Sequence, residues 1–442
     1  MWNHYFCAMT ALESNKNALL FILITICIDS IGLGIIIPSL PALIADASGL
    51  SISESSKYAG PVLSTYAVAQ FLFSPLIGNL SDRFGRKPII LVSLLGLGID
   101  FVFMYFAPTL AWLVVGRALS GMFGASFTTA AAYIADISTD ENRAKNFGLI
   151  GAAFGVGFIL GPAIGGLVSD WGVRAPFLVA AFFSLANFIY GLLFLKESLP
   201  QSQRRKFEWS RANPIGALVQ ITRFKRNAFL FLVIFLVLLA NMSVHSLWSY
   251  YSIARFGWTE KEVGISLAVV GVSFGLLQGA LAGPIVKKMG EKGAATLGLI
   301  TLVLVTTGIG LLPVGWMLYL IIVPYAFSGI FDPSVRSIIS RQTAANEQGE
   351  LQGIFTSMMS LAEIIGPVFM LFIFYKSTPL AKTNPTFYGM PFFVAGFIAM
   401  LALLLLRWVF AKKRVSDETI LDVPEAETAE TELLPVEQQN NH

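Results

Sequence analysis

The chain carries little charge, almost no cysteine and almost no histidine. Its 442 residues include 30 Lys or Arg, 27 Asp or Glu, 2 Cys and 3 His. A soluble domain is about 25% charged, whereas this chain is 13% charged. Two cysteines give neither a disulfide framework nor metal-ligand spacing, and no phosphate-binding loop with its lysine occurs. We therefore expect no cofactor, no bound metal, no nucleic-acid partner, no direct ATP coupling and no enzymatic activity.

Apolar residues dominate instead. They make up 55% of the chain, and the mean hydropathy is +0.70. A helix needs roughly 20 apolar residues to span a bilayer, and runs of that size recur along the sequence. They predict an all-α membrane protein with about twelve transmembrane helices, at 18–44, 57–80, 88–107, 110–135, 144–168, 174–195, 228–254, 262–286, 293–313, 315–339, 349–374 and 387–411.

The loops between these spans differ in basic residues, which sets the expected orientation. Lys and Arg gather in alternate loops and in the connector 196–227, and few lie in the other loops, so both termini are expected in the cytoplasm. The first span lacks the pattern of a cleaved signal and is expected to stay. The chain is predicted to be a multi-pass protein of the inner membrane, surrounded by lipid.

The chain divides into two similar halves. We expect a six-helix bundle over 1–195, a basic cytoplasmic connector over 196–227, a second bundle over 228–411 and a disordered cytoplasmic tail over 412–442. A charged turn follows the second span, and a worn copy follows the eighth span as Gly283-Pro-Ile-Val-Lys-Lys-Met-Gly-Glu-Lys. Parallel repeats with a binding site between them at mid-membrane are a design for alternating access.

The charged turn reads Gly-Asn-Leu-Ser-Asp-Arg-Phe-Gly-Arg-Lys-Pro over residues 78–88. This pattern resembles the signature between helices 2 and 3 of the major facilitator superfamily of secondary transporters. The resemblance implies two pseudo-symmetric bundles and a gate that holds them together on one membrane face and releases them. It also implies that Arg86 pairs with Asp136 as a latch. The gating residues expected from it are Gly78, Asp82, Arg83, Gly85, Arg86 and Asp136.

Span 5 carries a second signature, Gly-x-x-x-Gly-Pro-x-x-Gly-Gly, that is similar to one in the proton-coupled antiporter branch of this superfamily. Small residues four apart also serve ordinary close packing of helices, and that alternative stays open. The resemblance favours export over uptake. The residues concerned are Gly157, Gly161, Pro162, Gly165 and Gly166.

Further segments resemble the tetracycline/proton antiporters, among them Ile28-Asp-Ser-Ile-Gly-Leu-Gly in span 1 and Gly264-Ile-Ser-Leu-Ala in span 8. Gln278 matches that family. Phe274 stands where those antiporters carry a histidine, and Leu302 stands where they carry an acid. Both differences remove ionisable groups linked in the family to tetracycline-metal transport, so the substrate is left open.

Six ionisable residues fall inside the expected spans, and each costs about 2.5 to 3.5 kcal/mol to insert, so each needs a partner or a function. Poor solvation favours the neutral form of a carboxyl group, which then can take up a proton on one side and release it on the other. With Gln278, these are the candidate residues for proton coupling or substrate binding: Asp29, Asp100, Arg117, Asp332, Arg336 and Glu363.

Most of these residues also have a structural alternative. Asp29 would cap a helix break near Gly32 and Gly34, and Asp100 would be a static packing partner. Arg117 begins a Gly-Arg-x-x-x-Gly pattern that resembles a proton-transfer motif of the family, yet a fixed ion pair is the alternative.

For Asp332 and Arg336, one helical turn apart, the alternative is mutual neutralisation. Glu363 has no partner in its own span, which favours proton or cation binding. His245, beside Trp248, Tyr250 and Tyr251, is expected in an aromatic belt at the membrane surface.

Together these features predict a monomeric, proton-coupled antiporter that exports a small amphipathic drug or metabolite by alternating access. A carrier for a polar metabolite such as a siderophore or an organic acid is one alternative, because Arg117 and Arg336 would suit an anion. A non-transporting membrane receptor is another alternative.

Overall fold

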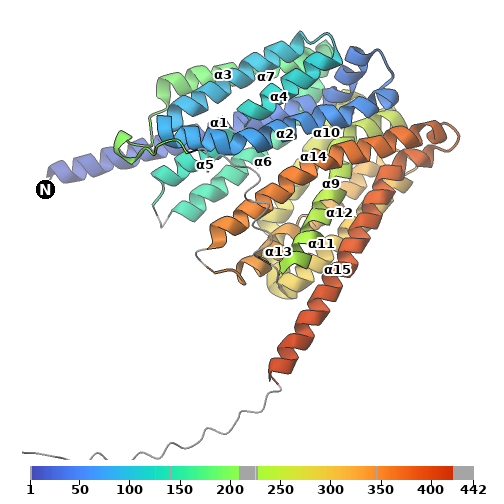
Figure 1. Ribbon diagram of the computed structural model, residues 1–442. Coiled ribbons are helices and arrows are strands. Elements are labelled where there is room, and N and C mark those ends of the chain that lie inside the picture. Colours follow the sequence, from blue (N-terminus) through green and yellow to red (C-terminus); the bar gives the residue numbers. More distant parts are fainter. Residues whose placement is uncertain are drawn as a thin grey trace, which may run out of the picture.

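A computed structural model describes residues 2–124, 126–139, 142–208, 224, 227–344 and 347–421. Those residues form a helical protein of two bundles (Figure 1). The first bundle comprises α1 (Trp2–Ser48), α2 (Ile52–Phe84), α3 (Arg86–Tyr105), α4 (Leu110–Phe123), α5 (Ser126–Ile137), α6 (Arg143–Val168), the short helix η1 (Ser169–Trp171) and α7 (Ala175–Phe194). A short helix, η2 (Gln201–Gln203), follows.

The second bundle repeats this plan. It comprises α9 (Ala228–Phe256), α10 (Glu260–Leu276), a π-helical turn η6 (Leu277–Leu281), α11 (Ala282–Leu311), α12 (Met317–Ser328), α13 (Phe331–Ser340), α14 (Gln348–Ala381), η8 (Pro385–Gly389) and α15 (Met390–Leu421). Two spans consist of a pair of shorter helices, α4 with α5 and α12 with α13.

The described residues contain 11 stretches long and apolar enough to cross a membrane, against the twelve predicted. One stretch, Glu260–Leu311, has 52 residues and would measure about 78 Å as a single helix, far more than the roughly 30 Å hydrocarbon layer. The backbone leaves the helical region inside it at Gly290, where φ is 70°. The stretch therefore supplies two spans, and the prediction of twelve is confirmed.

Two helices extend beyond the predicted spans. Helix α1 begins at Trp2, although its membrane-spanning part starts at Ala18 as predicted. Helix α15 continues to Leu421, so the prediction of a disordered tail was wrong for residues 412–421. Neither added stretch contains Gly or Pro, the residues that disfavour a helix most strongly. The rest of the tail, 422–442, and connector residues 209–223, 225 and 226 lie outside the described residues.

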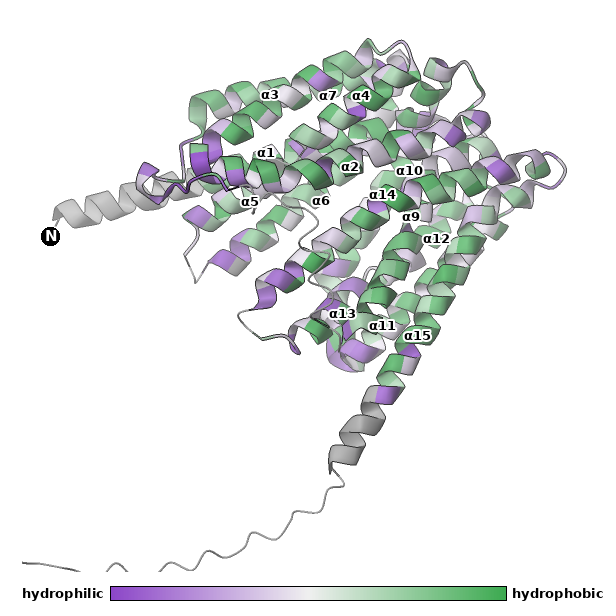
Figure 2. Ribbon diagram, viewed as in Figure 1, coloured by the Kyte–Doolittle hydropathy of each residue, from purple (hydrophilic) through white to green (hydrophobic). Residues whose placement is uncertain are grey.

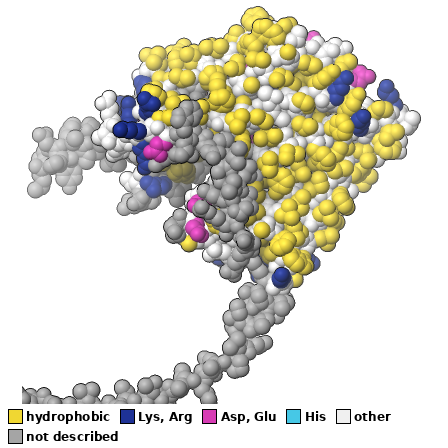
Figure 3. All heavy atoms as spheres, in the orientation of Figure 1, with side chains coloured by type: hydrophobic (Ala, Val, Ile, Leu, Met, Phe, Trp, Pro, Cys, Tyr) yellow, Lys and Arg dark blue, Asp and Glu magenta, His cyan; other side chains and the backbone are white. Residues whose placement is uncertain are grey.

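The surface between the helix ends is apolar. Hydrophobic side chains cover most of the face in Figure 3, and Lys and Arg lie towards its two ends. In Figure 2 the middle of most helices is hydrophobic and their ends are more hydrophilic. This distribution suits a protein embedded in a bilayer. Below, the motif side is the one that holds Gly85 and Gly290, and the far side is the one that holds Ser48 and Glu260.

The two bundles meet between mid-depth and the far side. Ser64 of α2 donates a hydrogen bond to the Ile364 carbonyl of α14 at 2.6 Å. Ser39 of α1 donates to the Glu260 carboxylate of α10, also at 2.6 Å. A Cβ built on Gly166 of α6 would lie 3.2 Å from Cα of Gly264 in α10. Side chains larger than hydrogen would hold α6 and α10 apart there.

Towards the motif side the bundles separate, as the diverging ends of α6 and α13 show (Figure 1). Gly155 lies one turn before Ile159, which contacts Gly271 of α10, but none of the described residues has an atom within 4 Å of a Cβ built on Gly155. The same holds for Gly275 and Gly279, one and two turns beyond Gly271. The face of small residues thus continues past the contact without a partner. The structure is open on the motif side and closed on the far side.

Candidate substrate and proton site

Asp100, Arg117 and Ser120 form a buried cluster inside the first bundle. The Ser120 hydroxyl donates to the Asp100 carboxylate and accepts from Arg117 Nη2 at 3.0 Å. Asp100 is 1% exposed, Arg117 is 6% exposed and Ser120 is 1% exposed. The serine thus bridges two charges of opposite sign, which compensates part of the cost of burying them. Sequence analysis missed Ser120, although it follows Arg117 by three residues on the same helix face.

One oxygen and one nitrogen of this cluster have no hydrogen-bond partner among the described residues, Asp100 Oδ1 and Arg117 Nε. Buried polar atoms are rarely left without a partner. The Asp100 carboxylate can therefore accept one more hydrogen bond, and the Arg117 guanidinium can donate one more.

Tyr66 of α2 packs against α4 beside this cluster. A Cβ built on Gly124, one turn beyond Ser120, would lie 2.9 Å from the Tyr66 hydroxyl, and Gln70, one turn along α2, donates to that hydroxyl at 3.3 Å. Neither Tyr66 nor Gln70 was predicted, because polar residues in α2 are numerous and sequence gives no sign of which of them face the cluster.

Glu363 brings the second bundle to this site. It is half-buried and precedes Ile364, whose carbonyl accepts from Ser64 of α2. It lies about 22 Å from the start of α14 at Gln348, near mid-depth. The turn of α14 that carries this carboxyl group is thus held against the first bundle.

Asp29 is also half-buried at mid-depth. Helix α1 runs through Gly32 and Gly34 without a break, so the structural alternative, in which Asp29 caps a break there, is wrong. A Cβ on Gly34 would lie 3.0 Å from Gly161 Cα of α6. These glycines instead permit α1 and α6 to approach closely.

Asp332 and Arg336 lie apart from this site, on α13. Arg336 Nε donates to the Asp332 carboxylate at 2.7 Å, and its guanidinium lies 4.3 Å from the centre of the Phe355 ring. This contact confirms the alternative in which the two residues neutralise each other.

Gln278 lies in the π-helical turn η6 and donates to the Gly329 carbonyl at 2.8 Å. Phe274, one turn earlier, packs edge-on against Tyr325 with ring centres 5.1 Å apart. Leu302 is 1% exposed in the core of the second bundle. The two positions that differ from the tetracycline antiporters are therefore apolar and packed.

His245 does not lie in a surface belt, so that prediction was wrong. It is exposed and sits about 17 Å from the end of α9 at Phe256, whereas Trp248, Tyr250 and Tyr251 are buried in the core. One turn before it, Asn241 accepts from the Tyr325 hydroxyl at 3.2 Å. One turn after it, Ser249 donates to the Ile37 carbonyl of α1. The Ser249 contact places this face of α9 towards the first bundle.

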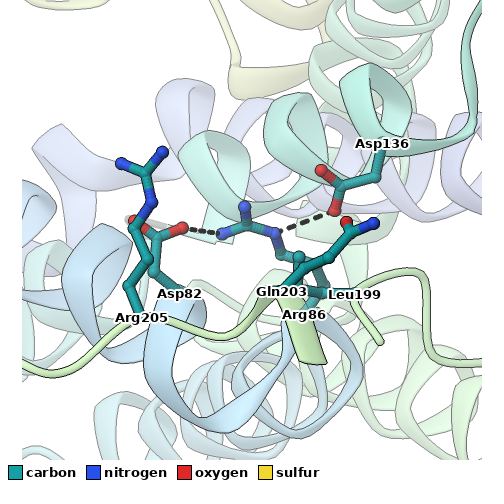
Figure 4. Close-up of a pocket in the computed structure, with 6 residues that line it drawn as sticks. All are labelled: Asp82, Arg86, Asp136, Leu199, Gln203 and Arg205. Atoms are coloured by element: carbon teal, nitrogen blue, oxygen red, sulfur yellow. Dashed lines mark hydrogen bonds and ion pairs between the residues drawn. The ribbon is translucent and has the colours of Figure 1, made fainter. Parts of the chain in front are cut away.

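The predicted latch on the motif side is present. Arg86 Nε donates to Asp136 at 3.1 Å, and Nη1 donates to Asp82 at 2.6 Å and to Ser81 at 2.7 Å. Figure 4 shows Arg86 between the two carboxylates, at a cavity of about 380 Å³. Gly85 permits the turn, with φ of 102°. Arg83 lies against the neighbouring Phe84 ring. A Cβ built on Gly78 would meet none of the described residues within 4 Å.

This latch closes within the first bundle and not between the bundles. The start of the connector completes it: Glu197 accepts from the Arg86 backbone N–H at 2.8 Å, and the Arg205 backbone N–H donates to the Asp82 carbonyl at 3.1 Å. The expectation that the turn holds the two bundles together does not apply to this conformation, because the bundles are apart on the motif side.

The signature in α6 packs against two helices. Cβ atoms on Gly161 and Gly165 would meet the α1 backbone at Ile31 and Ile35, and one on Gly157 would meet Cys27 and Ser30. Pro162 lies beside Gly34. Gly166, on another face, contacts α10. The packing interpretation of this motif is confirmed.

Comparison with known proteins agrees with this architecture. The sequence profile of the Major Facilitator Superfamily matches residues 22–329 and 256–436. The chain belongs to the major facilitator superfamily. It is a multi-pass membrane transporter and not an enzyme.

Individual relatives agree. The class C tetracycline resistance protein of Escherichia coli is 38% identical over 82% of this chain and 91% of its own length. The multidrug resistance protein 2 of Bacillus subtilis (strain 168) is 27% identical over 89% of this chain and 95% of its own length. The crystal structure of the nucleoside transporter NupG superposes with a TM-score of 0.71 at 13% identity, covering 90% of this chain and 99% of that one.

Proposed function

We propose that this protein exports a small amphipathic drug or metabolite in exchange for protons, by alternating access. The observation that carries the proposal is the presence of a half-buried acid near mid-depth on each bundle: Asp29 on α1, and Glu363 on the turn of α14 that Ser64 of α2 holds through the Ile364 carbonyl. A carboxyl group there gains from being neutral when it is dry and from being charged when water or a cationic ligand reaches it. Rocking of the bundles would change that exposure.

In this proposal the motif side is the cytoplasmic side and both termini are cytoplasmic, in the inner membrane. The relatives named for tetracycline resistance and multidrug resistance support an exported drug. Phe274 on Tyr325 and the buried Leu302 leave no ionisable group at the two positions linked to tetracycline-metal transport. We therefore expect amphipathic compounds to be moved without a bound metal ion.

The organic-acid alternative is less well supported. Arg117 is engaged by Ser120 beside Asp100, and Arg336 is held by Asp332 at 2.7 Å. Each arginine thus already has a partner within its own bundle, and binding an anionic substrate would have to displace it.

Proton movement in proteoliposomes tests the proposal. An internal pH-sensitive dye should report proton release or uptake when a tetracycline or another amphipathic drug is added across a pH gradient. Glu363→Gln should abolish substrate-dependent proton movement. Asp46→Asn is the matched control, because Asp46 pairs with Arg174 at 2.9 Å near the far surface and should retain activity. Binding without proton movement in the unmodified protein would contradict the proposal and favour a receptor.

A further inference from the structure

The worn copy of the charged turn makes an ion pair of its own. Gly290, with φ of 70°, takes the place of Gly85 in the second bundle, and the next residue is Glu291. The Glu291 carboxylate accepts from Arg341 Nη2 at 2.9 Å and from the Ser337 hydroxyl at 2.6 Å. Beside this pair lies a cavity of about 440 Å³.

This pair is the pseudo-symmetric counterpart of the latch in the first bundle, with the charges reversed. Arg86 and Asp136 are 50 residues apart in sequence, and the same separation holds for Glu291 and Arg341. Asp136 lies in the last turn of α5, and Arg341 directly follows α13. Each pair thus ties the residue after the turn glycine to the end of the fourth span of its bundle.

The two pairs also share an asymmetry of burial. The side chain after the glycine is the better buried one: Arg86 is 9% exposed and Asp136 20%, while Glu291 is 19% exposed and Arg341 75%. A buried charge that loses its partner is costly, whichever sign it has. Because each pair closes within its own bundle, the sign of the charges is free to differ between bundles.

We propose that Glu291 and Arg341 are positioning residues for transport. They form a charge-inverted clamp that keeps the motif side of the second bundle a single body while the bundles separate. The inference rests on the alternating access proposed above and not on the identity of the substrate. Loss of the clamp lets the part of α11 that follows Gly290 and the end of α13 move independently. This destabilises the conformation open on the motif side, because the bundles are apart there and the first bundle does not support these segments.

The rate of thiol labelling measures how much of the protein is open on the motif side, and it needs no substrate. A reporter Gly151→Cys, placed where nothing lies within 4 Å of a built Cβ, in a chain with Cys7 and Cys27 replaced by serine, should react with an impermeant maleimide from the motif side. Glu291→Gln and Arg341→Gln should each lower the labelling rate and the maximal transport rate about fivefold, equivalent to about 1 kcal/mol, with KM changed less than twofold.

The decisive variant combines Glu291→Arg with Arg341→Asp, which installs the charge order of the first bundle. It should restore labelling and the maximal rate to within about twofold of the parent. Lys288→Gln, on an exposed residue of the same turn, is the control and should change neither. The inference is overturned if the single variants label like the parent, or if they lower only the yield or melting temperature. It is also overturned if the reversed pair fails to rescue while remaining folded.

Discussion

The contact between α6 and α10 gives the sharpest test of the closed far side. Gly264→Ala adds one methyl group where a Cβ collides with the Pro162 carbonyl and lies 3.0 Å from Gly166 Cα. Both neighbours are backbone atoms, so no side chain can turn away to make room. The two helices must separate, and α6 cannot retreat easily because a Cβ on its Gly161 would already lie 2.8 Å from Gly34 Cα of α1.

Overpacking of this kind costs about 1 to 3 kcal/mol. The cost falls only on the conformation in which α6 and α10 touch, so it lowers the ratio of that conformation to the one open on the far side by about 5- to 150-fold. Once the conformation closed on the far side is no longer the predominant one, the Gly151→Cys reporter on the motif side should react more slowly by a similar factor. Transport should fall with it, because one conformation of the cycle becomes scarce.

Gly275→Ala is the matched control, since the same helix carries it three turns further towards the motif side and nothing lies within 4 Å of its Cβ. It should not lower the labelling rate, and the removal of a helix-interior glycine should stabilise α10 by up to about 1 kcal/mol. Equal labelling and transport in the parent and in Gly264→Ala would refute the assignment of this contact as the far-side seal.

Three further predictions concern single side chains. Arg86→Ala leaves two partly buried carboxylates facing each other and should lower stability by about 2 kcal/mol, seen as a lower melting temperature in detergent; Arg86→Lys should recover only part, because lysine lacks the forked geometry. Tyr66→Phe should reduce proton-coupled transport about tenfold while substrate-independent folding measures stay unchanged, and parental activity would exclude the hydroxyl from the pathway. His245→Ala should raise KM several-fold at an unchanged maximal rate, whereas an unaltered KM would show that this face of α9 does not meet the substrate.

Sequence patterns predicted the elements of the fold because membrane insertion imposes strong local constraints. Long apolar runs, charged turns and small residues four apart each act within one helix or one loop. The pairing of Arg86 with Asp136 was also predicted, but only from the resemblance, since nothing in the sequence alone links two residues 50 positions apart. The division of 262–313 into two spans was likewise predicted from the charged residues around Gly290, whereas the pairing of Glu291 with Arg341 was not.

The site itself was predicted unevenly, and the reason is physical. Acids in apolar runs are conspicuous because their cost is visible in the sequence, so Asp29, Asp100 and Glu363 were identified. Tyr66 and His245 are amphipathic residues that a membrane helix tolerates on any face, and only the neighbouring contacts of α2 and α9 show which way they point. Function at this site depends on the face as much as on the residue type.

The conformation is a further property that sequence did not determine. The residues of α6 that touch α10 near the far side continue along the same face to Gly155, where the described part of the chain offers no partner. Small residues towards both ends of this face would permit contact at either end, so that protons or substrate could shift the balance between the two closures. The same small residues leave the closed side unpredictable from sequence.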